Sequence, residues 1–237
     1  MLDLDIRSKS FGARAVLRDV CLQVKPRETV AILGPSGCGK STLLRIAAGL
    51  DRDYDGRVTL SGSAGVVFQE PRLMPWLTVA DNVGFPLGHK QGGDARVARL
   101  LGEVGLADAA GKYPKELSGG MAQRVAIARG FVTEPQLILL DEPFSAVDAF
   151  TRARLQDLLL AVAKKHGTAV LLVTHDIDEA LYLADRVLVL GGYENAGRIA
   201  AEYTLAAPRP RDRGDVNLNQ LKARILDLLA PKPARAA

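Results

Sequence analysis

The sequence predicts an α/β fold in which helices flank a mostly parallel sheet. Residues 29–33 form a continuous apolar run, which is typical of a strand covered on both faces. Strand-like and helical stretches alternate from residue 137 to residue 190, as in a parallel sheet with crossover helices. Residues 2–6 and 20–24 instead alternate apolar with polar side chains, which predicts an N-terminal antiparallel portion with one buried face.

The individual elements are expected from local patterns in chain order. After the two alternating strands and the buried strand 29–33, a glycine-rich turn should lead into a helix over residues 40–48, followed by short strands near 58–60 and 65–68. Between Pro71 and Pro135 strand-like runs vanish, and helical patterns at 96–106 and 122–131 predict an inserted α-helical subdomain. Further strands are expected at 137–140, 169–173 and 186–190, with helices at 151–165, 176–184 and 219–229.

Composition places the chain among globular proteins without restricting its partners. The 237 residues are 48% hydrophobic and 24% charged, and the net charge is +4. Cys21 and Cys38 match no metal-site or disulfide pattern. The N-terminus lacks the features of a signal peptide, and no apolar run approaches the roughly 18–20 residues that a membrane helix needs. A role at a membrane would therefore require other proteins to hold the chain there.

The glycine-rich turn carries a phosphate-binding motif. Gly34 to Ser41 reads G-P-S-G-C-G-K-S, and it follows a buried strand and opens a helix, as this motif requires. Glycines let backbone N–H groups turn toward phosphate oxygens, and the helix N-terminus favours an anion. Lys40 can reach the β- and γ-phosphates, and the Ser41 hydroxyl can ligate Mg²⁺. The alternative, a loop that merely turns the chain, does not account for this context. The motif predicts the core of a P-loop NTPase.

A pair of carboxylates follows a second buried strand. Asp141 and Glu142 come directly after residues 137–140, at the end of the strand where α/β sheets bind ligands. Asp141 is placed to hold Mg²⁺, and Glu142 to activate the attacking water. Two solvated acids would be the alternative, but a neighbouring phosphate loop favours catalysis. His175 also follows a strand, and it could donate to a γ-phosphate oxygen rather than serve as an ordinary polar residue.

A second glycine motif suggests that the active site is shared between two chains. Leu117 to Met121 reads L-S-G-G-M at the start of a helix, and Ser118 with its glycines offers another anion-binding N-terminus. One nucleotide cannot easily use two such sites in one chain. We therefore expect a dimer in which Ser118 and Gly120 cap the partner's γ-phosphate.

Six motifs in order make the chain resemble the ATP-binding subunits of ABC transporters, up to about Pro208. They are Phe11, the phosphate loop, Gln69, residues 117–121, residues 137–142 with Ser145 to Asp148 behind them, and His175. Met121 stands where the family most often has glutamine, and Phe11 where tyrosine is commoner. Neither departure removes a phosphate ligand. The resemblance implies one ATP-binding domain, with a RecA-like core at 1–70 and 136–207, a helical subdomain at 71–135, and a C-terminal tail and helix at 208–237.

The resemblance also implies a set of site residues. Glu142, His175, Gln69 and Lys40 are expected to serve catalysis, while Ser41, Gln69 and Asp141 hold Mg²⁺. Phe11 would stack on adenine with Val16 against the ribose, and Ser145 to Asp148 would cross the dimer interface. The expected ATP contacts are Phe11, Val16, Gln69, and Gly34, Pro35, Ser36, Gly37, Cys38, Gly39, Lys40, Ser41 and Thr42, with Ser118, Gly119 and Gly120 acting across the dimer.

Methionine at the end of the second glycine motif, with the segments around Gln69 and Glu142, resembles one branch of importers. That branch handles nitrate, aliphatic sulfonates, taurine and similar small molecules. The implied partners are a second ATP-binding subunit, expected to be identical, membrane-spanning permease subunits, and indirectly a solute-binding protein. The implied location is the cytoplasmic face of the inner membrane. The transported solute does not follow from this sequence, because its specificity lies in other proteins.

Two other functions share parts of the pattern: an ABC-type ATPase that acts on DNA or on the ribosome rather than in transport, and a kinase that uses the same phosphate loop. Chromosome-type relatives carry a long coiled coil between their ATPase halves, whereas only about 70 residues separate Gln69 from Asp141, and translation-type relatives carry two cassettes in one chain. A kinase would leave residues 117–121 unexplained. The arginines near 209, 211 and 213 could contact nucleic acid, but such a stretch is usually a solvated face, and no nucleic-acid partner is expected.

The segment after Gln69 allows two interpretations. Residues 70–83 mix prolines with Leu73, Met74, Trp76 and Leu77. One interpretation packs these side chains inside the helical subdomain. The other makes them a groove for a short helix of the permease, with Trp76 as its anchor.

Overall fold

The computed structural model describes residues 1–88, 93–191 and 196–230. They form two compact units built from interleaved stretches of the chain. The first unit comprises Met1, Val24–Glu28 and Leu60–Leu171. The second comprises Leu2–Gln23, Thr29–Thr59 and the described residues within Leu172–Ala237. Each unit is described on its own.

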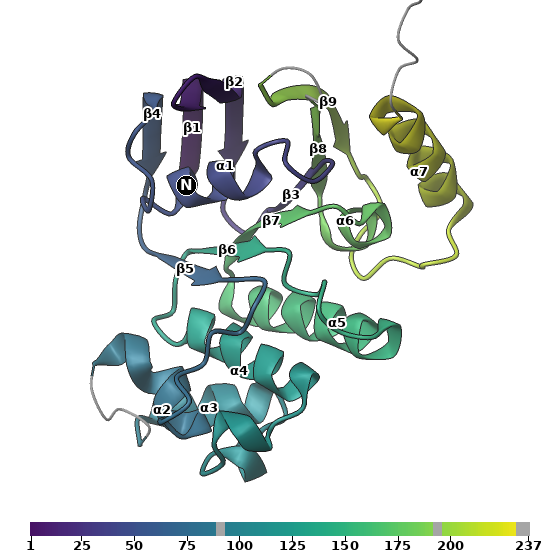
Figure 1. Cartoon of the computed structure of the whole chain (residues 1–237). Helices are drawn as coiled ribbons and strands as arrows, with labels where there is room; N and C mark the ends of the chain where they lie inside the picture. Colours follow the sequence, from purple (N-terminus) through teal and green to yellow (C-terminus); the bar gives the residue numbers. More distant parts are fainter. Residues whose placement is uncertain (89–92, 192–195, 231–237) are drawn as a thin grey trace, which may run out of the picture. The chain divides into compact units, whose positions relative to one another are not determined.

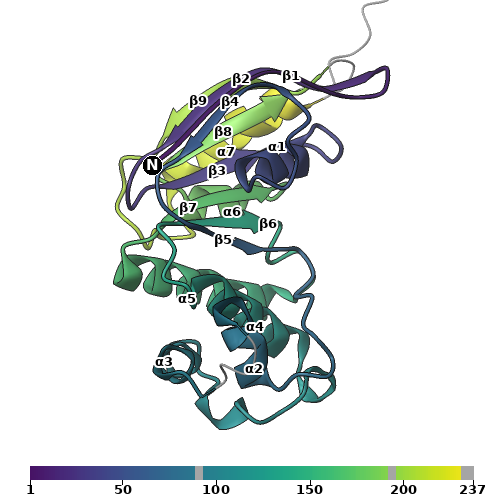
Figure 2. The same ribbon diagram turned by 90° about the vertical axis from the view of Figure 1, so that its left-hand side faces the viewer.

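In the first unit, helices pack against a short stretch of β-sheet. Its strands follow the order β5 (Ala64–Val67), β6 (Leu137–Asp141) and the first half of β7 (Ala169–Thr174), and β5 and β6 are parallel with Val67 opposite Leu140. α4 (Gly119–Phe131) packs on β5 and on α5 (Ala149–His166), while α2 (Val79–Gly84) and α3 (Ala95–Glu103) pack on α4, as Figures 1 and 2 show. Short 3₁₀ helices lie at Phe85–Leu87, Ala107–Ala109 and Pro114–Glu116.

Each α-helix of the first unit begins at a residue whose side chain satisfies a free backbone amide. Unpaired amides at helix starts need acceptors, and Ser, Thr and Asp supply them well. The capping residues are Thr78 for α2, Asp94 for α3, Ser118 for α4 and Asp148 for α5. α5 ends at Gly167, which adopts the left-handed conformation that terminates helices.

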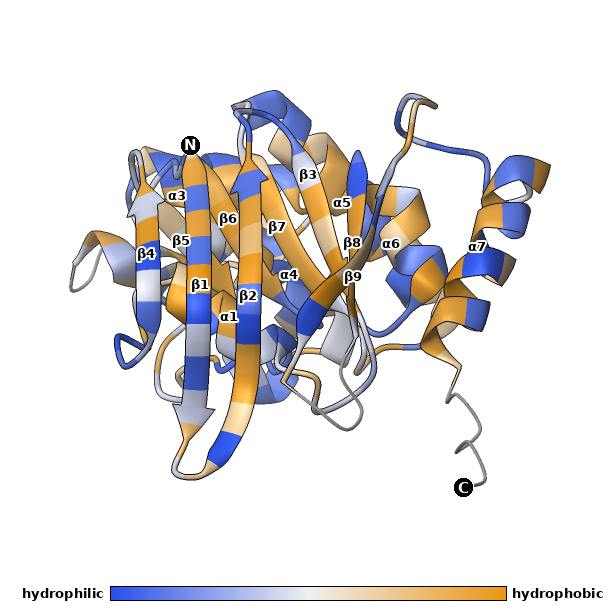
Figure 3. Cartoon of the chain, turned by 90° about the horizontal axis from the view of Figure 1, so that it is seen from above, coloured by the Kyte–Doolittle hydropathy of each residue, from blue (hydrophilic) through white to orange (hydrophobic). Residues whose placement is uncertain are grey.

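The second unit contains an antiparallel sheet and the remaining strands of the core. β1 (Leu2–Phe11) lies between β2 (Arg14–Val24) and β4 (Asp55–Leu60), and Leu2, Leu4 and Ile6 are buried on one face. Figure 3 shows the resulting alternation of hydropathy along β1. The second half of β7 neighbours β3 (Thr29–Leu33), followed by β8 (Arg186–Gly191) and β9 (Arg198–Thr204). β3 and β8 are parallel, whereas β8 and β9 are antiparallel.

Three helices belong to the second unit. α1 (Lys40–Ala47) follows the glycine-rich turn, and α6 (Ile177–Leu183) packs on β3 and on α7 (Val216–Leu229). α7 turns Ile225 inward, and Figure 3 shows polar and apolar faces along this helix. Within the described stretches, no helix combines the length and the apolar character needed to span a membrane.

Most expected elements are confirmed, with boundaries shifted by a few residues. All five residues of β3 are buried, as the continuous apolar run predicts. β9 and α2 have no counterpart in the prediction. β9 alternates between exposed and half-buried residues, but two adjacent alanines, which have low strand propensity, weaken the pattern in the sequence. α2 is only six residues long, too short for a clear period.

The interpretation of the arginines after Pro208 as a solvated face is wrong for two of them. Arg211 is only 6% exposed, and its guanidinium donates hydrogen bonds to backbone carbonyls. Arg209 is also partly buried and forms an ion pair with Asp185. The physical reason is that a helix end leaves carbonyls without partners, and arginine can satisfy several of them together.

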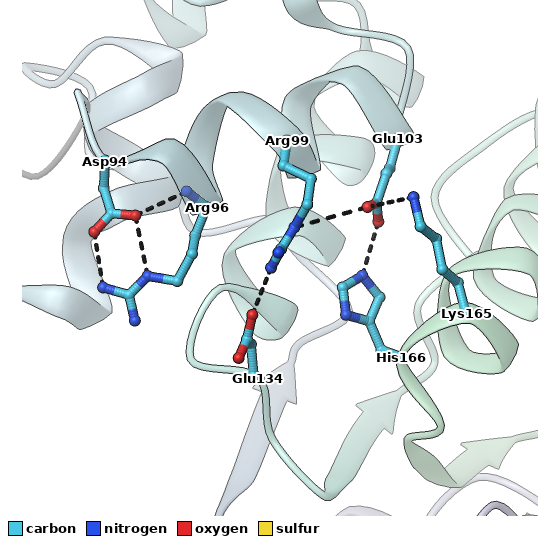
Figure 4. Close-up of polar contacts among 7 residues, drawn as sticks. All are labelled: Asp94, Arg96, Arg99, Glu103, Glu134, Lys165 and His166. Carbon is cyan, nitrogen blue, oxygen red and sulfur yellow. Dashed lines mark hydrogen bonds and ion pairs between the residues drawn. The ribbon is translucent and has the colours of Figure 1, made fainter.

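Charged side chains connect α3 to α5 and to the turn after α4. Glu103 lies at the end of α3, where His166 donates to its Oε2 at 2.8 Å and the Lys165 ammonium lies 2.8 Å from its Oε1 (Figure 4). Burial alone would raise the pKa of Glu103, but the hydrogen bonds from Lys165 and His166 outweigh it and hold the pKa below its ordinary value. Nearby, Arg99 bonds Glu134.

The start of α3 carries a second charge pair. The Arg96 guanidinium donates to both carboxylate oxygens of Asp94, and this hydrogen bonding lowers the pKa of Asp94 to about 2 (Figure 4). The same carboxylate caps the helix by accepting from the Arg96 amide. Asp94 therefore remains charged across the physiological range, and the start of α3 keeps its cap.

The Glu103 contacts should make stability depend on pH. We expect Glu103→Gln to reduce the free energy of unfolding by roughly 1–3 kcal/mol at neutral pH, because the pairing of a largely buried carboxylate is lost. Since the folded-state pKa lies below the ordinary value of 4.5, the contribution is complete above that value and is lost as pH falls through the folded pKa. Urea titrations of both proteins at pH 7 and pH 4 would measure the difference.

Glu134→Gln is the matched control, because Glu134 is about half exposed and pairs only at the surface. It should change stability much less. Equal losses from both substitutions would contradict a specific role for the Glu103 cluster.

Candidate nucleotide-binding site

The turn between β3 and α1 has the backbone geometry of a phosphate-binding loop. Gly39 immediately precedes α1 and has φ 105°, a conformation that side chains with a Cβ rarely adopt. The Leu43 amide donates to the Gly39 carbonyl, so helical bonding begins at this residue. The sequence after β3 therefore turns sharply into a helix whose N-terminal amides lie beside the loop, as an anion site needs.

Lys40 is buried beside the loop that it follows. Its ammonium donates to the Gly34 carbonyl at 2.8 Å and to the Pro35 carbonyl at 3.0 Å, and the residue is only 4% exposed. These contacts position a cation along the loop backbone. The expected roles of Ser36, Gly37, Cys38, Ser41 and Thr42 follow from their places in the same turn and first helical turn.

Gly197 supports the phosphate loop from a distant part of the sequence. A Cβ at this position would lie 2.1 Å from the Cys38 carbonyl, so only glycine allows the approach. The Gly197 amide also donates to the Val16 carbonyl, and the Arg18 amide donates to the Gly197 carbonyl. The sequence alone does not indicate this residue, because an isolated glycine before a strand carries no motif.

Phe11 has the exposure that a base-stacking residue requires. It ends β1 and is 55% exposed. The Lys9 ammonium lies over its ring, 4.4 Å from the ring centre. Burial alone would lower the pKa of Lys9, but hydrogen bonds to Asp51 and Asp53 raise it above the ordinary value. A charged Lys9 thus helps to fix the orientation of the Phe11 ring.

In the first unit, Gln69, Asp141 and Glu142 follow two paired parallel strands. Val67 is opposite Leu140, Gln69 lies two residues after β5, and Asp141 ends β6. Because parallel strands end at the same edge of a sheet, the structure brings these three residues to one edge of this unit. Gln69 is exposed there.

The backbone of Glu142 is strained. Its φ is 44°, which is uncommon for a residue with a side chain and is often found at functional sites. The Ser145 amide and hydroxyl both donate to the Glu142 carbonyl, at 3.3 and 3.0 Å. Ser145 therefore stabilises the turn that orients the carboxylate, a role the sequence did not indicate.

The second glycine motif forms the start of α4. The Ser118 hydroxyl accepts from the Met121 amide, which caps the helix. A Cβ at Gly120 would lie 2.6 Å from the Thr151 methyl group, whereas a Cβ at Gly119 would meet nothing within 4 Å. Gly120 is thus required by packing within this unit, while Gly119 leaves the helix start open.

Asp148, expected in the loop that crosses the dimer interface, has a local role at the start of α5. Its carboxylate accepts from the Thr151 amide at 3.0 Å. Hydrogen bonds from Thr151 hold the pKa of Asp148 below its ordinary value. The segment from Ser145 to Asp148 is therefore a turn fixed at both ends, and Phe150, which follows it, is 86% exposed.

Arg129 connects α4 to the segment after Gln69. Its guanidinium donates to the Pro71 carbonyl at 2.6 Å and to the Arg72 carbonyl at 2.9 Å, and burial lowers its pKa. Arg72 itself has φ 46°. The helix that begins with Ser118 therefore holds the backbone just beyond Gln69. The sequence alone does not indicate this role of Arg129, because arginine is an ordinary helix residue.

His175 lies in the second unit, directly after β7, and is exposed. The next residue, Asp176, donates its amide to the Thr174 hydroxyl and caps α6 by accepting from the Glu179 amide. β7 neighbours β3 in the strand order, so His175 and the phosphate loop follow adjacent strands. The structure thus groups His175 with the phosphate loop, Phe11 and Val16 in one unit, and groups Gln69, Asp141, Glu142 and Ser118 in the other.

The chain matches the family model described as ABC transporter over residues 17–145. It is 58% identical to the aliphatic sulfonates import ATP-binding protein SsuB 2 of Burkholderia lata, covering 100% of this chain and 89% of that protein. It is 56% identical to the protein of the same name in Pseudomonas aeruginosa, covering 95% of each. A solved dimeric ATP-binding cassette, in a post-hydrolysis state with ADP and Pi bound, matches with a TM-score of 0.74 and 32% identity over 88% of this chain and 100% of that one.

These similarities show that the chain belongs to the ABC transporter family, as its ATP-binding and ATP-hydrolysing subunit. Its fold is that of a P-loop NTPase, and ATP with Mg²⁺ is its nucleotide. The residues fit that nucleotide: a Cβ at Gly37, which has φ 79°, would meet nothing within 4 Å, so the loop is open there, and the buried Lys40 supplies a cation. Such subunits dimerise and associate peripherally with a membrane as part of a transporter.

The close approach at Gly197 predicts a defect in nucleotide binding. In Gly197→Ala the new Cβ must displace the Cys38 carbonyl, which moves the phosphate loop. We expect ATP to bind roughly tenfold more weakly or worse, since displacements near 1 Å can have large effects on a preorganised site. Titration of the purified protein with a fluorescent ATP analogue would measure the Kd.

Gly102→Ala provides the comparison, because a Cβ there meets nothing within 4 Å and alanine favours the interior of α3. It should bind ATP normally and be slightly more stable. Unchanged ATP affinity in a folded Gly197→Ala protein would show that Gly197 does not hold the loop.

Proposed function

We propose that this chain is the subunit that energises an importer of aliphatic sulfonates, with taurine or nitrate as less favoured solutes. The observation that supports this is the 58% identity over the whole chain to a protein named for aliphatic sulfonate import. In this proposal ATP binding closes a dimer, closure moves the membrane-spanning permease, and hydrolysis resets it. The remaining partners are the permease and, through it, a solute-binding protein, at the cytoplasmic face of the inner membrane.

Each proposed site residue has a chemical role in that cycle. Lys40 and the backbone N–H groups from Gly34 to Thr42, apart from Pro35, which has none, bind the phosphates. Phe11 and Val16 bind the base and ribose. Ser41, Asp141 and Gln69 hold Mg²⁺, which neutralises phosphate charge when it is bound. Glu142 accepts a proton from the attacking water, and His175 donates to the γ-phosphate. The strained backbone of Glu142, fixed by Ser145, supports a preorganised carboxylate.

The dimer is proposed to form from two identical chains. Ser118, Gly119 and Gly120 of one copy would cap the γ-phosphate bound by the other, with Ser145 to Asp148 of each copy at the interface. The open space at Gly119 supports this arrangement, because a helix start without covering atoms can accept a ligand from outside. Residues 71–135 would then move as a helical subdomain that carries Ser118 toward the partner's nucleotide.

The permease contact is proposed to lie at Trp76. This side chain is 72% exposed, so the interpretation that it packs inside the subdomain is wrong. The backbone around it is held by the fully buried Asn82, whose amide donates to the carbonyls of Met74, Leu77 and Thr78 and accepts from the Met74 amide. A rigid turn that presents a tryptophan outward is suited to binding, because little conformational entropy is lost on contact.

The test is transport by the assembled system. The chain, its permease and its solute-binding protein would be reconstituted in proteoliposomes, and uptake of labelled ethanesulfonate would be compared with taurine and nitrate. We expect ATP-dependent uptake of the alkanesulfonate, abolished by Glu142→Gln, which should still bind ATP because the amide keeps the shape but cannot accept a proton. Uptake of nitrate alone would contradict the proposed solute, and normal hydrolysis by Glu142→Gln would contradict its role.

Trp76→Ala should separate ATP binding from coupling. We expect the variant to fold and to bind ATP with unchanged affinity, because the Trp76 side chain is mostly exposed and contributes little to the core. Assembly with the permease should weaken by roughly 2 kcal/mol or more, as for other buried tryptophans at interfaces. Co-purification with the permease and sulfonate uptake would both report the loss.

Leu50→Ala is the control, since Leu50 is also a large exposed apolar residue but lies in the second unit. It should assemble and transport normally. If Trp76→Ala does the same, the permease contacts another surface.

A further inference from the structure

The segment from Leu205 to Arg213, here called the arginine segment, connects β9 to α7 and contacts α6. It has no role in the nucleotide site described above. It carries three arginines at alternate positions, Arg209, Arg211 and Arg213, and all three reach toward α6 or the residues beside it. They thus contact the helix whose capping residue, Asp176, directly follows His175.

Arg211 satisfies the carbonyl end of α6. Its Nη1 donates to the carbonyls of Leu181, Tyr182 and Ala184, at 3.0, 3.3 and 2.7 Å. Its Nε donates at 3.0 Å to the Ala207 carbonyl in its own segment, which helps to fix the orientation of the guanidinium. A cation at this end of a helix is favourable, because the last carbonyls are unpaired and carry partial negative charge.

Arg209 ties the same helix end to the start of β3. It donates to the Leu183 carbonyl at 3.2 Å and to the Thr29 hydroxyl, and it forms an ion pair with Asp185 at 2.9 Å. The same Asp185 oxygen accepts from the Thr29 amide at 2.8 Å. Because β3 leads directly into the phosphate loop, this network joins α6 to the strand that carries the loop.

The remaining contacts hold the side and the beginning of α6. The Arg213 guanidinium lies 3.6 Å from the ring centre of Tyr182. Lys222 of α7 forms an ion pair at 2.6 Å with Asp178, in the first turn of α6. Side chains from the C-terminal part of the chain therefore contact both ends of α6.

α6 depends on such support because it is only seven residues long. Helices of this length are not stable on their own in water. Its cap, Asp176, is the neighbour of His175 in sequence, so a shift or fraying of α6 would move the imidazole. Stability by itself does not require a buried arginine at this place, because well-packed apolar residues of similar volume often stabilise a buried site equally well.

We infer that the arginine segment positions His175 for ATP hydrolysis, with Arg211 as the principal positioning residue. This inference rests on the proposed role of His175 at the γ-phosphate. It assigns to the C-terminal part of the chain a function in the ATPase cycle rather than in nucleic-acid binding. Arg211 acts through α6 and does not touch the nucleotide.

The test is a double-substitution cycle in the full-length protein. Arg211→Ala should lower kcat for ATP hydrolysis roughly tenfold or more, while the Kd for ATP, bound mainly by the phosphate loop, changes less than about twofold. Arg211→Lys keeps the charge but not the planar, multiple-donor guanidinium, so its kcat should lie between those of the unsubstituted protein and Arg211→Ala. In a His175→Ala background, Arg211→Ala should lower the residual kcat no further, because the group it positions is absent.

Arg224→Ala, on the exposed side of α7, is the matched control and should leave kcat unchanged in both backgrounds. If Arg211→Ala does not fold, Arg211→Lys and Lys222→Ala replace it in the same cycle. Unchanged kcat in a folded Arg211 variant, or an equal fractional loss with and without His175, would overturn the inference. Unchanged kcat in His175→Ala alone would instead overturn the proposed role of His175.

Discussion

Backbone carbonyl groups outside the ladders of helices and strands must still find hydrogen-bond donors, and in this protein arginines supply many of them. Arg129 bonds two carbonyls beyond Gln69, and Arg211 bonds the end of α6. Both guanidiniums are partly removed from water, and burial lowers the pKa of each, yet arginine stays charged. Arg129 therefore holds the backbone just beyond Gln69, and Arg211 holds the far end of the helix whose start lies beside His175, each from a distant segment of the chain.

The features that sequence predicted well are those encoded locally. The apolar run of β3, the glycines of the phosphate loop and the capping serine of α4 each combine a short pattern with a strict conformational requirement. Gly39 is an example, because its φ of 105° leaves almost no alternative to glycine. Chemistry that depends on such turns can be inferred from a single sequence, and the family similarity agrees with it.

The features that sequence did not predict depend on partners far along the chain. Gly197 is required because Cys38, about 160 residues earlier, approaches it, and nothing near Gly197 indicates this. The polar stretch containing Arg211 suggests a solvated surface until the carbonyls of α6 are seen beside it. At Gly120 the motif predicts a phosphate contact, and the structure adds a packing requirement that the motif does not indicate, because a Cβ there would lie 2.6 Å from the Thr151 methyl group. Local patterns thus indicate the chemistry of a motif, whereas the packing contacts of its residues become clear only in the folded structure.

What an exposed apolar residue indicates about binding depends on how firmly the backbone around it is held. Leu226 and Leu228 are exposed on α7, near the end of the described chain, where single apolar residues are common on protein surfaces. Trp76 differs because a fully buried asparagine, Asn82, makes four hydrogen bonds to the turn that carries it. Burying a polar amide is favourable only if its bonds are satisfied, so Asn82 strongly restricts the turn. A fixed turn with an outward tryptophan retains an exposed apolar surface that a flexible loop could fold away, which is why exposure at this position supports binding.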